Sequence, residues 1–298
     1  METRRGTWYA IVAYVLWGLS PIFWNLMPDI SATTLILSRI VWSVPLLIAV
    51  LAFTGGLSSI ATSYRSWKPR MLTAAAAGFL FINWALFVWS VANGHIVDAS
   101  LGYFINPLVS VGLGVIVLGE RLRKVQWVAI GFAAVGVVIM TIVVGSLPWI
   151  SLTLAFSFGM YGLLKKQPDT PPPVTSLLGE TGLIAIPALI YMVAFNESTG
   201  PSFGSSPGVS IFLASAGVVT VVPLLLFGGA AKRIPLSMVG LLQYITPTLQ
   251  LFLGVVIYGE MLSGEKLVGF VAVWIALGLY SADSFRSKQS RAVPIPLD

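Results

Sequence analysis

The stretch INPLVSVGLGVIVLGE (residues 105–120) decides how this sequence is organised, because a second copy, ITPTLQLFLGVVIYGE (residues 245–260), follows 140 positions later. Seven of the sixteen aligned positions are identical, including the proline and the closing Gly-Glu pair. The flanks differ, since the basic RLRK follows the first copy and the less basic MLSGEK follows the second. The repetition indicates a duplicated unit whose two copies lie in different surroundings.

The composition is that of a membrane protein. Of the 298 residues, 57% are hydrophobic and 9% are charged, whereas soluble domains carry roughly 25% charged residues. Apolar runs of about 20 residues, enough to cross a hydrocarbon core of roughly 30 Å, recur along the whole chain. The first run, residues 8–26, is too long for a signal peptide and lacks a cleavage site after it, so we expect it to be retained as a membrane helix.

Apolar spans separated by short, turn-forming breaks predict an all-α integral membrane protein with ten transmembrane helices. The predicted spans are residues 8–27, 32–53, 71–92, 98–118, 126–145, 149–164, 174–195, 208–231, 237–258 and 266–283.

The basic residues predict the orientation of these helices. Fifteen of the seventeen Lys and Arg residues fall in the N-terminus, the even-numbered loops and the C-terminal tail. Cytoplasmic loops keep an excess of positive charge, so both termini should be cytoplasmic, in a multi-pass protein of the inner (plasma) membrane. The net charge of +6 then reflects topology and requires no nucleic-acid partner.

The two copies of the repeated stretch must have opposite orientations. A unit of five helices crosses the membrane an odd number of times, so a second unit inserts upside down. We therefore predict two inverted five-helix repeats, residues 1–145 and 146–285, followed by a cytoplasmic tail, residues 286–298. Inverted repeats are typical of secondary transporters, which bind their substrate near mid-membrane at the repeat interface.

Polar residues at helical spacing form matching stripes in the repeated helices. The first stripe is Ser100, Tyr103, Asn106 and Ser110, and the second is Gln243, Thr246 and Gln250. Because a polar side chain facing lipid is costly, both stripes should point inward. They either line a cavity or hydrogen-bond neighbouring helices as packing contacts. Pro107 and Pro247 fall within the stripes and kink their helices, either as gating hinges or as static bends.

Aromatic and polar residues on the inward faces are the candidate substrate-binding residues. Aromatic walls with scattered hydrogen-bonding groups suit a partly apolar, neutral or zwitterionic substrate. Arg39, inside a predicted span, would hold a substrate carboxylate; the alternative is a structural pairing or snorkelling to the interface. The full set is Trp17, Arg39, Asn83, Trp84, Tyr103, Asn106, Tyr161, Gln243, Tyr244 and Thr246.

Glu180 is the acidic residue that the predicted spans place well inside the membrane, so it is the candidate for proton coupling, with structural pairing as the alternative. Its depth differs from that of Arg39 by about 10 Å at 1.5 Å per residue, which argues against an ion pair between them. Glu120 and Glu260 lie at helix ends, where a carboxylate can cap the free amides of a helix N-terminus.

Three longer stretches carry a family resemblance: AYVLWGLSPIFWN (residues 13–25), NWALFVWSVANGHIVDASLGYFINPL (residues 83–108) and VVPLLLFGGAAKRIPLSMVGLLQYITPTL (residues 221–249). The chain resembles the EamA family of the drug/metabolite transporter superfamily and, within it, the RarD-like permeases. The resemblance implies an inner-membrane carrier whose helices one to four and six to nine surround a central cavity, with the fifth and tenth set apart. It does not imply a particular substrate.

We therefore expect a secondary transporter (permease) that moves small organic metabolites or drugs across the cytoplasmic membrane by alternating access, in the export direction. The sequence contains no Walker loop, which argues against direct ATP coupling. The alternatives are a passive channel or facilitator, and an integral membrane enzyme acting on lipids. One His and no Cys leave that enzyme little acid-base or metal chemistry. We expect no cofactor and no metal, and a monomer or homodimer in the lipid bilayer.

Overall fold

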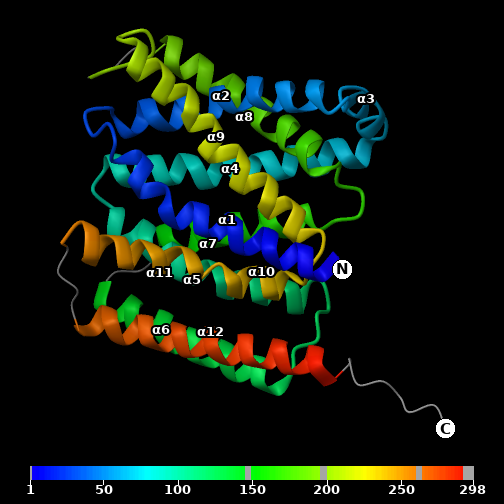
Figure 1. The fold of residues 1–298 in the computed structure, drawn as a ribbon, viewed down its shortest axis with the longest axis vertical. Helices are drawn as coiled ribbons and strands as arrows, with labels where there is room; N and C mark the ends of the chain where they lie inside the picture. Colours follow the sequence, from blue (N-terminus) through cyan, green and yellow to red (C-terminus); the bar gives the residue numbers. More distant parts are fainter. Residues whose placement is uncertain (1, 145–148, 195–199, 260–263, 291–298) are drawn as a thin grey trace.

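The computed structural model describes all residues except 1, 145–148, 195–199, 260–263 and 291–298, and is a bundle of helices (Figure 1). The described residues contain no β-strand. The helices are α1 (Glu2–Trp24), α2 (Ala32–Phe53), α3 (Ser58–Ser63), α4 (Trp67–Ala92), α5 (Ile96–Ile116), α6 (Lys124–Val144), α7 (Trp149–Lys165), α8 (Pro173–Ala194), α9 (Pro207–Ala231), α10 (Leu236–Leu242), α11 (Ile245–Phe252), the π-helix η1 (Leu253–Ile257) and α12 (Gly264–Ser290).

Among the described residues, seven helical segments are long and apolar enough to cross a membrane. They are α1, α2, α4, α5, α8, α9 and the combined segment Leu236–Ile257. Helices α6 and α12 contribute shorter apolar stretches, Lys124–Ile139 and Leu267–Leu279, and α7 has 17 residues. The prediction of an all-α, multi-pass membrane protein is thus confirmed, and every predicted span overlaps a helix of the structure.

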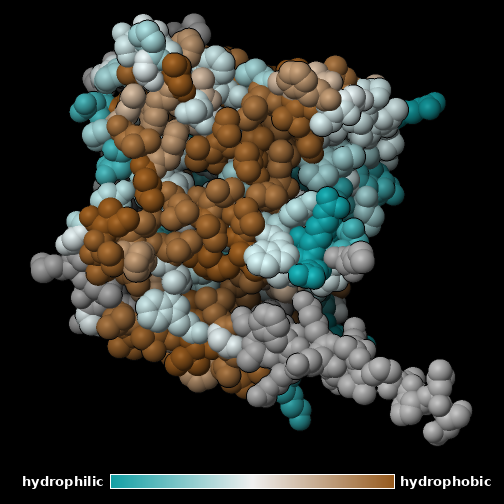
Figure 2. All heavy atoms as spheres, in the orientation of Figure 1, coloured by the Kyte–Doolittle hydropathy of each residue, from teal (hydrophilic) through white to brown (hydrophobic). Residues whose placement is uncertain are grey.

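The helices lie across the view of Figure 1 in a stack, with α6 and α12 together at one end. The start of α1 and the last turns of α12 lie on the same side of this stack. Figure 2 shows apolar residues over the middle of this face and the most hydrophilic group on the side where α1 begins. This distribution is what a bilayer around the middle of the helices requires.

Several predicted boundaries were wrong. Helix α1 begins at Glu2 and α4 at Trp67, because polar residues at a membrane surface can continue a helix beyond its apolar span. Helix α12 continues to Ser290, so residues 286–290 of the predicted tail are helical. The short helix α3, in the loop after α2, has no apolar span to reveal it in the sequence.

The two copies of the repeated stretch fold differently around their prolines. Helix α5 continues through Pro107, whereas the predicted span 237–258 is broken between α10 and α11. Pro247 has no N–H to offer the carbonyl of Gln243, which instead accepts from the Thr246 N–H at 3.0 Å in a tighter turn. Pro247 therefore contributes locally to the break in the second copy.

Small residues bring α6 and α12 into close contact. Ala129, Ala133, Ala272 and Ala276 are all buried, and a Cβ added at Gly136 would lie 2.9 Å from the Gly269 carbonyl oxygen. Side chains larger than alanine would force these backbones apart. Small residues thus allow close packing of α6 against α12.

Candidate functional site

A cavity of about 540 Å³ opens between the first and second halves of the chain. Helices α1, α2, α4 and α5 line it from the first half, and α7, α9 and the α10–η1 segment line it from the second. Its polar and aromatic lining residues are Trp17, Ser20, Trp24, Arg39, Asn83, Trp84, Phe87, Ser100, Tyr103, Asn106, Phe158, Thr220, Gln243, Thr246, Gln250 and Tyr258. No described residue of α6, α8 or α12 contributes to the lining.

Eight of the ten predicted binding residues lie in this lining: Trp17, Arg39, Asn83, Trp84, Tyr103, Asn106, Gln243 and Thr246. The matched positions 106 and 246, and 103 and 243, thus face one space from opposite halves of the chain. The expectation that the seventh predicted helix, now α8, surrounds the cavity is wrong, because its inward polar side chains contact α7 instead.

Tyr161 and Tyr244 do not line the cavity, contrary to the sequence-based expectation. Both are completely buried. The Tyr161 hydroxyl donates to Glu180 at 3.0 Å, and the Tyr244 hydroxyl donates to the Phe104 carbonyl oxygen at 3.1 Å. Each side chain packs between helices, and its hydroxyl has the hydrogen-bond partner that a buried hydroxyl requires.

Arg39 and Asn106 present polar atoms that the protein leaves unpaired. The half-buried guanidinium of Arg39 lies 4.9 Å from the ring centroid of Trp84, and its Nε has no hydrogen-bond partner among the described residues. The same is true of the Asn106 Oδ1, whose residue is 4% exposed. Buried polar atoms are nearly always satisfied, so each of these two lining residues carries a buried atom for which the described part of the chain supplies no partner.

Other lining residues also bind neighbouring helices, so the polar stripes combine both roles that the sequence left open. Asn83 donates to the Leu154 carbonyl oxygen at 2.9 Å and to Ser157 at 3.1 Å, which joins α4 to α7. Thr246 donates to the carbonyl oxygen of Tyr14 at 2.9 Å, which joins α11 to α1. These bonds hold the cavity walls in place.

Aromatic rings form the apolar part of the wall. Trp17 lies 5.8 Å from Phe158 and 6.0 Å from Phe227, centroid to centroid. The cluster joins α1, α7 and α9, so rings from both halves of the chain meet beside the polar groups. A ligand in this cavity would contact aromatic surface on one side and hydrogen-bonding groups on the other.

Glu180 lies outside the cavity in a buried ion pair. Its carboxylate contacts the Lys165 Nζ and the Ser176 hydroxyl, both at 2.5 Å, in addition to Tyr161. The side chains of Lys165 and Glu180 are 2% and 0% exposed. Four groups on α7 and α8 thus satisfy one another, as a buried charge requires.

Sequence reasoning missed Lys165, which it assigned to a cytoplasmic loop. A usable signal was the spacing, because Lys165 follows Tyr161 by four residues and therefore shares its helix face. Lys165 is the last residue of α7, and its long side chain places the ammonium group inside the bundle.

Glu120 caps a helix, as its position predicted, but the helix belongs to the other half of the chain. Its carboxylate accepts from the backbone N–H groups of Leu236 at 2.6 Å and Ser237 at 2.9 Å, and from the Ser237 hydroxyl at 2.7 Å. These are the first residues of α10. Glu260 lies outside the described residues. No cluster of three or more His, Asp or Glu side chains that could hold a metal occurs in the described part of the chain.

Comparison with known proteins agrees with this architecture. The chain is 44% identical to "Protein RarD" of Streptomyces exfoliatus over 98% of its length and 93% of that protein. It is 40% identical to "Uncharacterized transporter YojE" of Bacillus subtilis (strain 168) over 97% of both chains. A solved crystal structure with 17% identity shares the fold, with a TM-score of 0.73 over 93% of this chain and 97% of the other. The sequence model of the EamA-like transporter family matches residues 4–142 and 147–282, so the chain belongs to the EamA-like transporter family and is similar to its RarD proteins.

Proposed function

We propose that this protein is a secondary transporter that exports small organic metabolites or drugs across the cytoplasmic membrane by alternating access. One observation carries the proposal: both halves of the chain line a single cavity, and its lining includes the charged side chain of Arg39 and the amide of Asn106. A carrier needs such a site at the interface of two parts that can rock against each other.

The cavity chemistry supports a substrate class. A guanidinium binds carboxylate or other acceptor oxygens, while Trp17, Trp84 and Phe158 offer aromatic surface. We therefore propose a small, partly apolar molecule with an acceptor group, neutral or zwitterionic overall. A donor on the substrate would satisfy the Asn106 Oδ1.

The proposed topology is ten membrane helices in two inverted repeats, residues 1–145 and 146–285, with both termini cytoplasmic. The start of α1 and the last turns of α12 lie on the same side of the stack, which supports placing both termini on one side of the membrane (Figure 1). The basic residues gathered in the N-terminus, the even-numbered loops and the tail also support this topology, as do the two successive stretches that match the family.

We further propose that Glu180 couples transport to a proton gradient. Here its carboxylate is paired with Lys165, as the ionised state requires. A conformation in which α7 and α8 separate would leave the carboxylate without its partner, and protonation would then become favourable.

The test is substrate counterflow in proteoliposomes. A thermal-shift screen of the purified protein against amino acids, nucleosides, sugars and aromatic drugs selects ligands, and vesicles preloaded with a ligand are then given a trace of labelled ligand outside. A carrier gives transient accumulation of label, whereas a passive channel gives simple equilibration and would contradict the proposal. Flux in vesicles of known protein orientation establishes the direction.

A further inference from the structure

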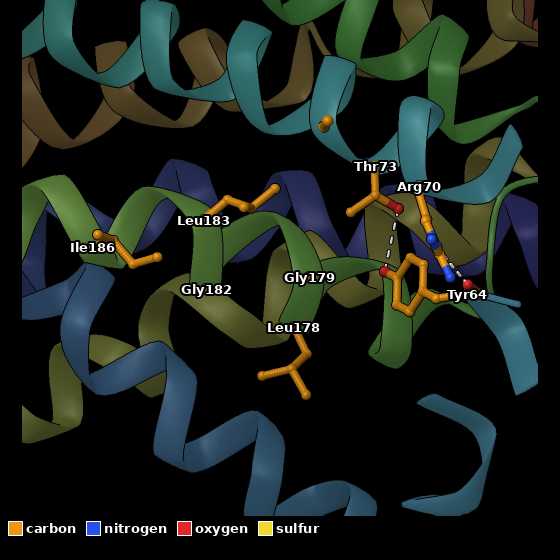
Figure 3. A pocket seen from close by; sticks show the side chains of 9 residues that line it. Tyr64, Arg70, Thr73, Leu178, Gly179, Gly182, Leu183 and Ile186 are labelled. Atoms are coloured by element: carbon orange, nitrogen blue, oxygen red, sulfur yellow. Dashed lines mark hydrogen bonds between the residues drawn. The ribbon is translucent and has the colours of Figure 1, made fainter. Parts of the chain in front are cut away.

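A second concavity lies away from the central cavity, on the outer surface between α4 and α8. Its volume is about 560 Å³. The lining residues used below are Tyr64, Arg70, Thr73, Gly179, Gly182 and Ile186, and we call this concavity the α4–α8 groove. Figure 3 shows Tyr64 and Arg70 at one end of the groove and Ile186 at the other, with Gly182 between them.

The polar end of the groove is built by the segment that joins α3 to α4. The Tyr64 hydroxyl donates to the Thr175 carbonyl oxygen at 3.2 Å and accepts from Thr73 at 3.2 Å. A Cβ at Gly179 would overlap this hydroxyl, so the glycine allows Tyr64 to rest on α8. Burial raises the pKa of the Tyr64 hydroxyl above its ordinary value.

Arg70 carries a positive charge with no acidic partner among the residues that the structure describes. Its Nε donates to the Tyr64 carbonyl oxygen at 2.7 Å, which fixes the guanidinium at the mouth of the groove. The described residues provide no acceptor for its terminal nitrogens, and the side chain is exposed. Arg65, also exposed, adds positive charge in the same segment.

The rest of the groove is apolar and exposed at the surface of the protein. Leu183 and Ile186 are 49% and 58% exposed, and a Cβ at Gly182 would meet no atom within 4 Å. The apolar part of the groove therefore fits a hydrocarbon chain along α8, and the end at Arg70 offers a site for an anion. A free phosphate would fill only the Arg70 end.

We propose that the α4–α8 groove binds an anionic phospholipid from the leaflet on the basic side of the protein, with its phosphate at Arg70 and an acyl chain over Gly182. Basic sites between membrane helices hold anionic headgroups by charge, while lipid chains fill the apolar surface below. Gly179 precedes Glu180 in the chain, so the lipid would bind to the helix that carries Glu180.

The experiment measures phosphatidylglycerol binding to the whole protein in phosphatidylcholine nanodiscs, by thermal stability and by lipid retention in native mass spectrometry. Arg70→Gln should weaken binding about fivefold, the contribution of one basic residue near an anionic surface. Gly182→Leu should weaken it by filling the chain site. Arg121→Gln, which removes an exposed charge on the same side, and Gly131→Leu, which adds the same side chain on exposed α6, are the matched controls.

The outcomes separate the site from general attraction. Wild-type affinity in both Arg70→Gln and Gly182→Leu would overturn the proposal, as would equal losses in the test and control variants. If glycerol phosphate alone gives the full thermal shift, the groove binds an anion and not a lipid, and the proposal fails. Arg70 lies at the surface, so its variant tests the site even if Gly182→Leu does not fold.

Discussion

At the scale of single residues, the hydrogen-bond partners of a side chain distinguish a residue that packs against a neighbouring helix from one that is free to bind substrate. Asn83 and Asn106 both line the cavity, but Asn83 donates to α7 and the Asn106 Oδ1 has no partner in the described structure. Removing a partnered amide leaves the other group unsatisfied in the interior, whereas removing an unpaired one does not. The same substitution should therefore have different effects at these two positions.

Asn106→Ala is expected to weaken substrate binding about fivefold, the loss of one hydrogen bond of roughly 1 kcal/mol, with little change in melting temperature. Gln243→Ala should behave in the same way, because its side chain also lines the cavity. Asn83→Ala, the matched control, should lower the melting temperature because it removes the two hydrogen bonds that join α4 to α7. Ligand titration and thermal unfolding check both. Unchanged affinity in Asn106→Ala and Gln243→Ala would assign these side chains to packing.

The Lys165–Glu180 pair requires a balanced substitution. Glu180→Gln alone leaves the Lys165 charge buried without its partner, and breaking a buried pair costs about 3–5 kcal/mol. The double variant Lys165→Gln, Glu180→Gln removes both charges and should fold. It should exchange substrate at equilibrium but fail to accumulate substrate under a pH gradient. Normal accumulation in the folded double variant would show that Glu180 carries no proton. Tyr161→Phe is the control, because it removes only the hydrogen bond from Tyr161 to Glu180.

At the scale of elements, Glu120 links the end of α5 to the start of α10. Glu120→Ala removes three acceptor contacts from the first turn of α10 and should destabilise the protein by about 0.5–2 kcal/mol, the usual range for a lost N-cap. Asp169→Asn is the control, because its contact with Lys68 is 4.0 Å long and exposed. Thermal unfolding in detergent distinguishes them. Equal melting temperatures for the two variants would contradict a capping role.

The proline positions show how similar sequences give different elements. The α5 copy continues through Pro107, while the second copy is divided near Pro247 and ends in the π-helix η1. Each proline removes one helical hydrogen bond, so local sequence predicts a bend in both. Contacts with the neighbouring helices decide its size, and these differ: Tyr244 and Thr246 bond to α5 and α1 at the break.

At the scale of the whole molecule, topology is open to a direct test, because the chain has no cysteine. Ala61→Cys, exposed in α3, and Ser205→Cys, exposed before α9, introduce small thiols on sides predicted to be opposite. A membrane-impermeant maleimide on intact cells should label position 205 and should reach position 61 only after permeabilisation. Labelling of position 61 from outside would overturn the proposed orientation.

The sequence by itself determined the membrane class, the helical segments and the transporter family. These follow from apolar runs, short turn-forming breaks and repeated stretches, all of which are local properties of the chain. Most of the cavity lining could also be predicted, because polar residues at helical spacing share one face and avoid lipid. Local pattern does not say which helix that face meets, so Tyr161 and Tyr244 were assigned to the cavity although they pack between helices.

Only the tertiary structure decided which side chains and helices contact each other. Lys165 lies at a helix end in sequence, but its side chain meets Glu180 on the next helix, and Glu120 caps a helix 116 positions away. The α4–α8 groove likewise requires Tyr64, from one half of the chain, to rest against Gly179 of the other. Such contacts depend on how far and at what angle whole helices approach each other. That approach is decided by close packing over the entire bundle, which no short stretch of sequence contains.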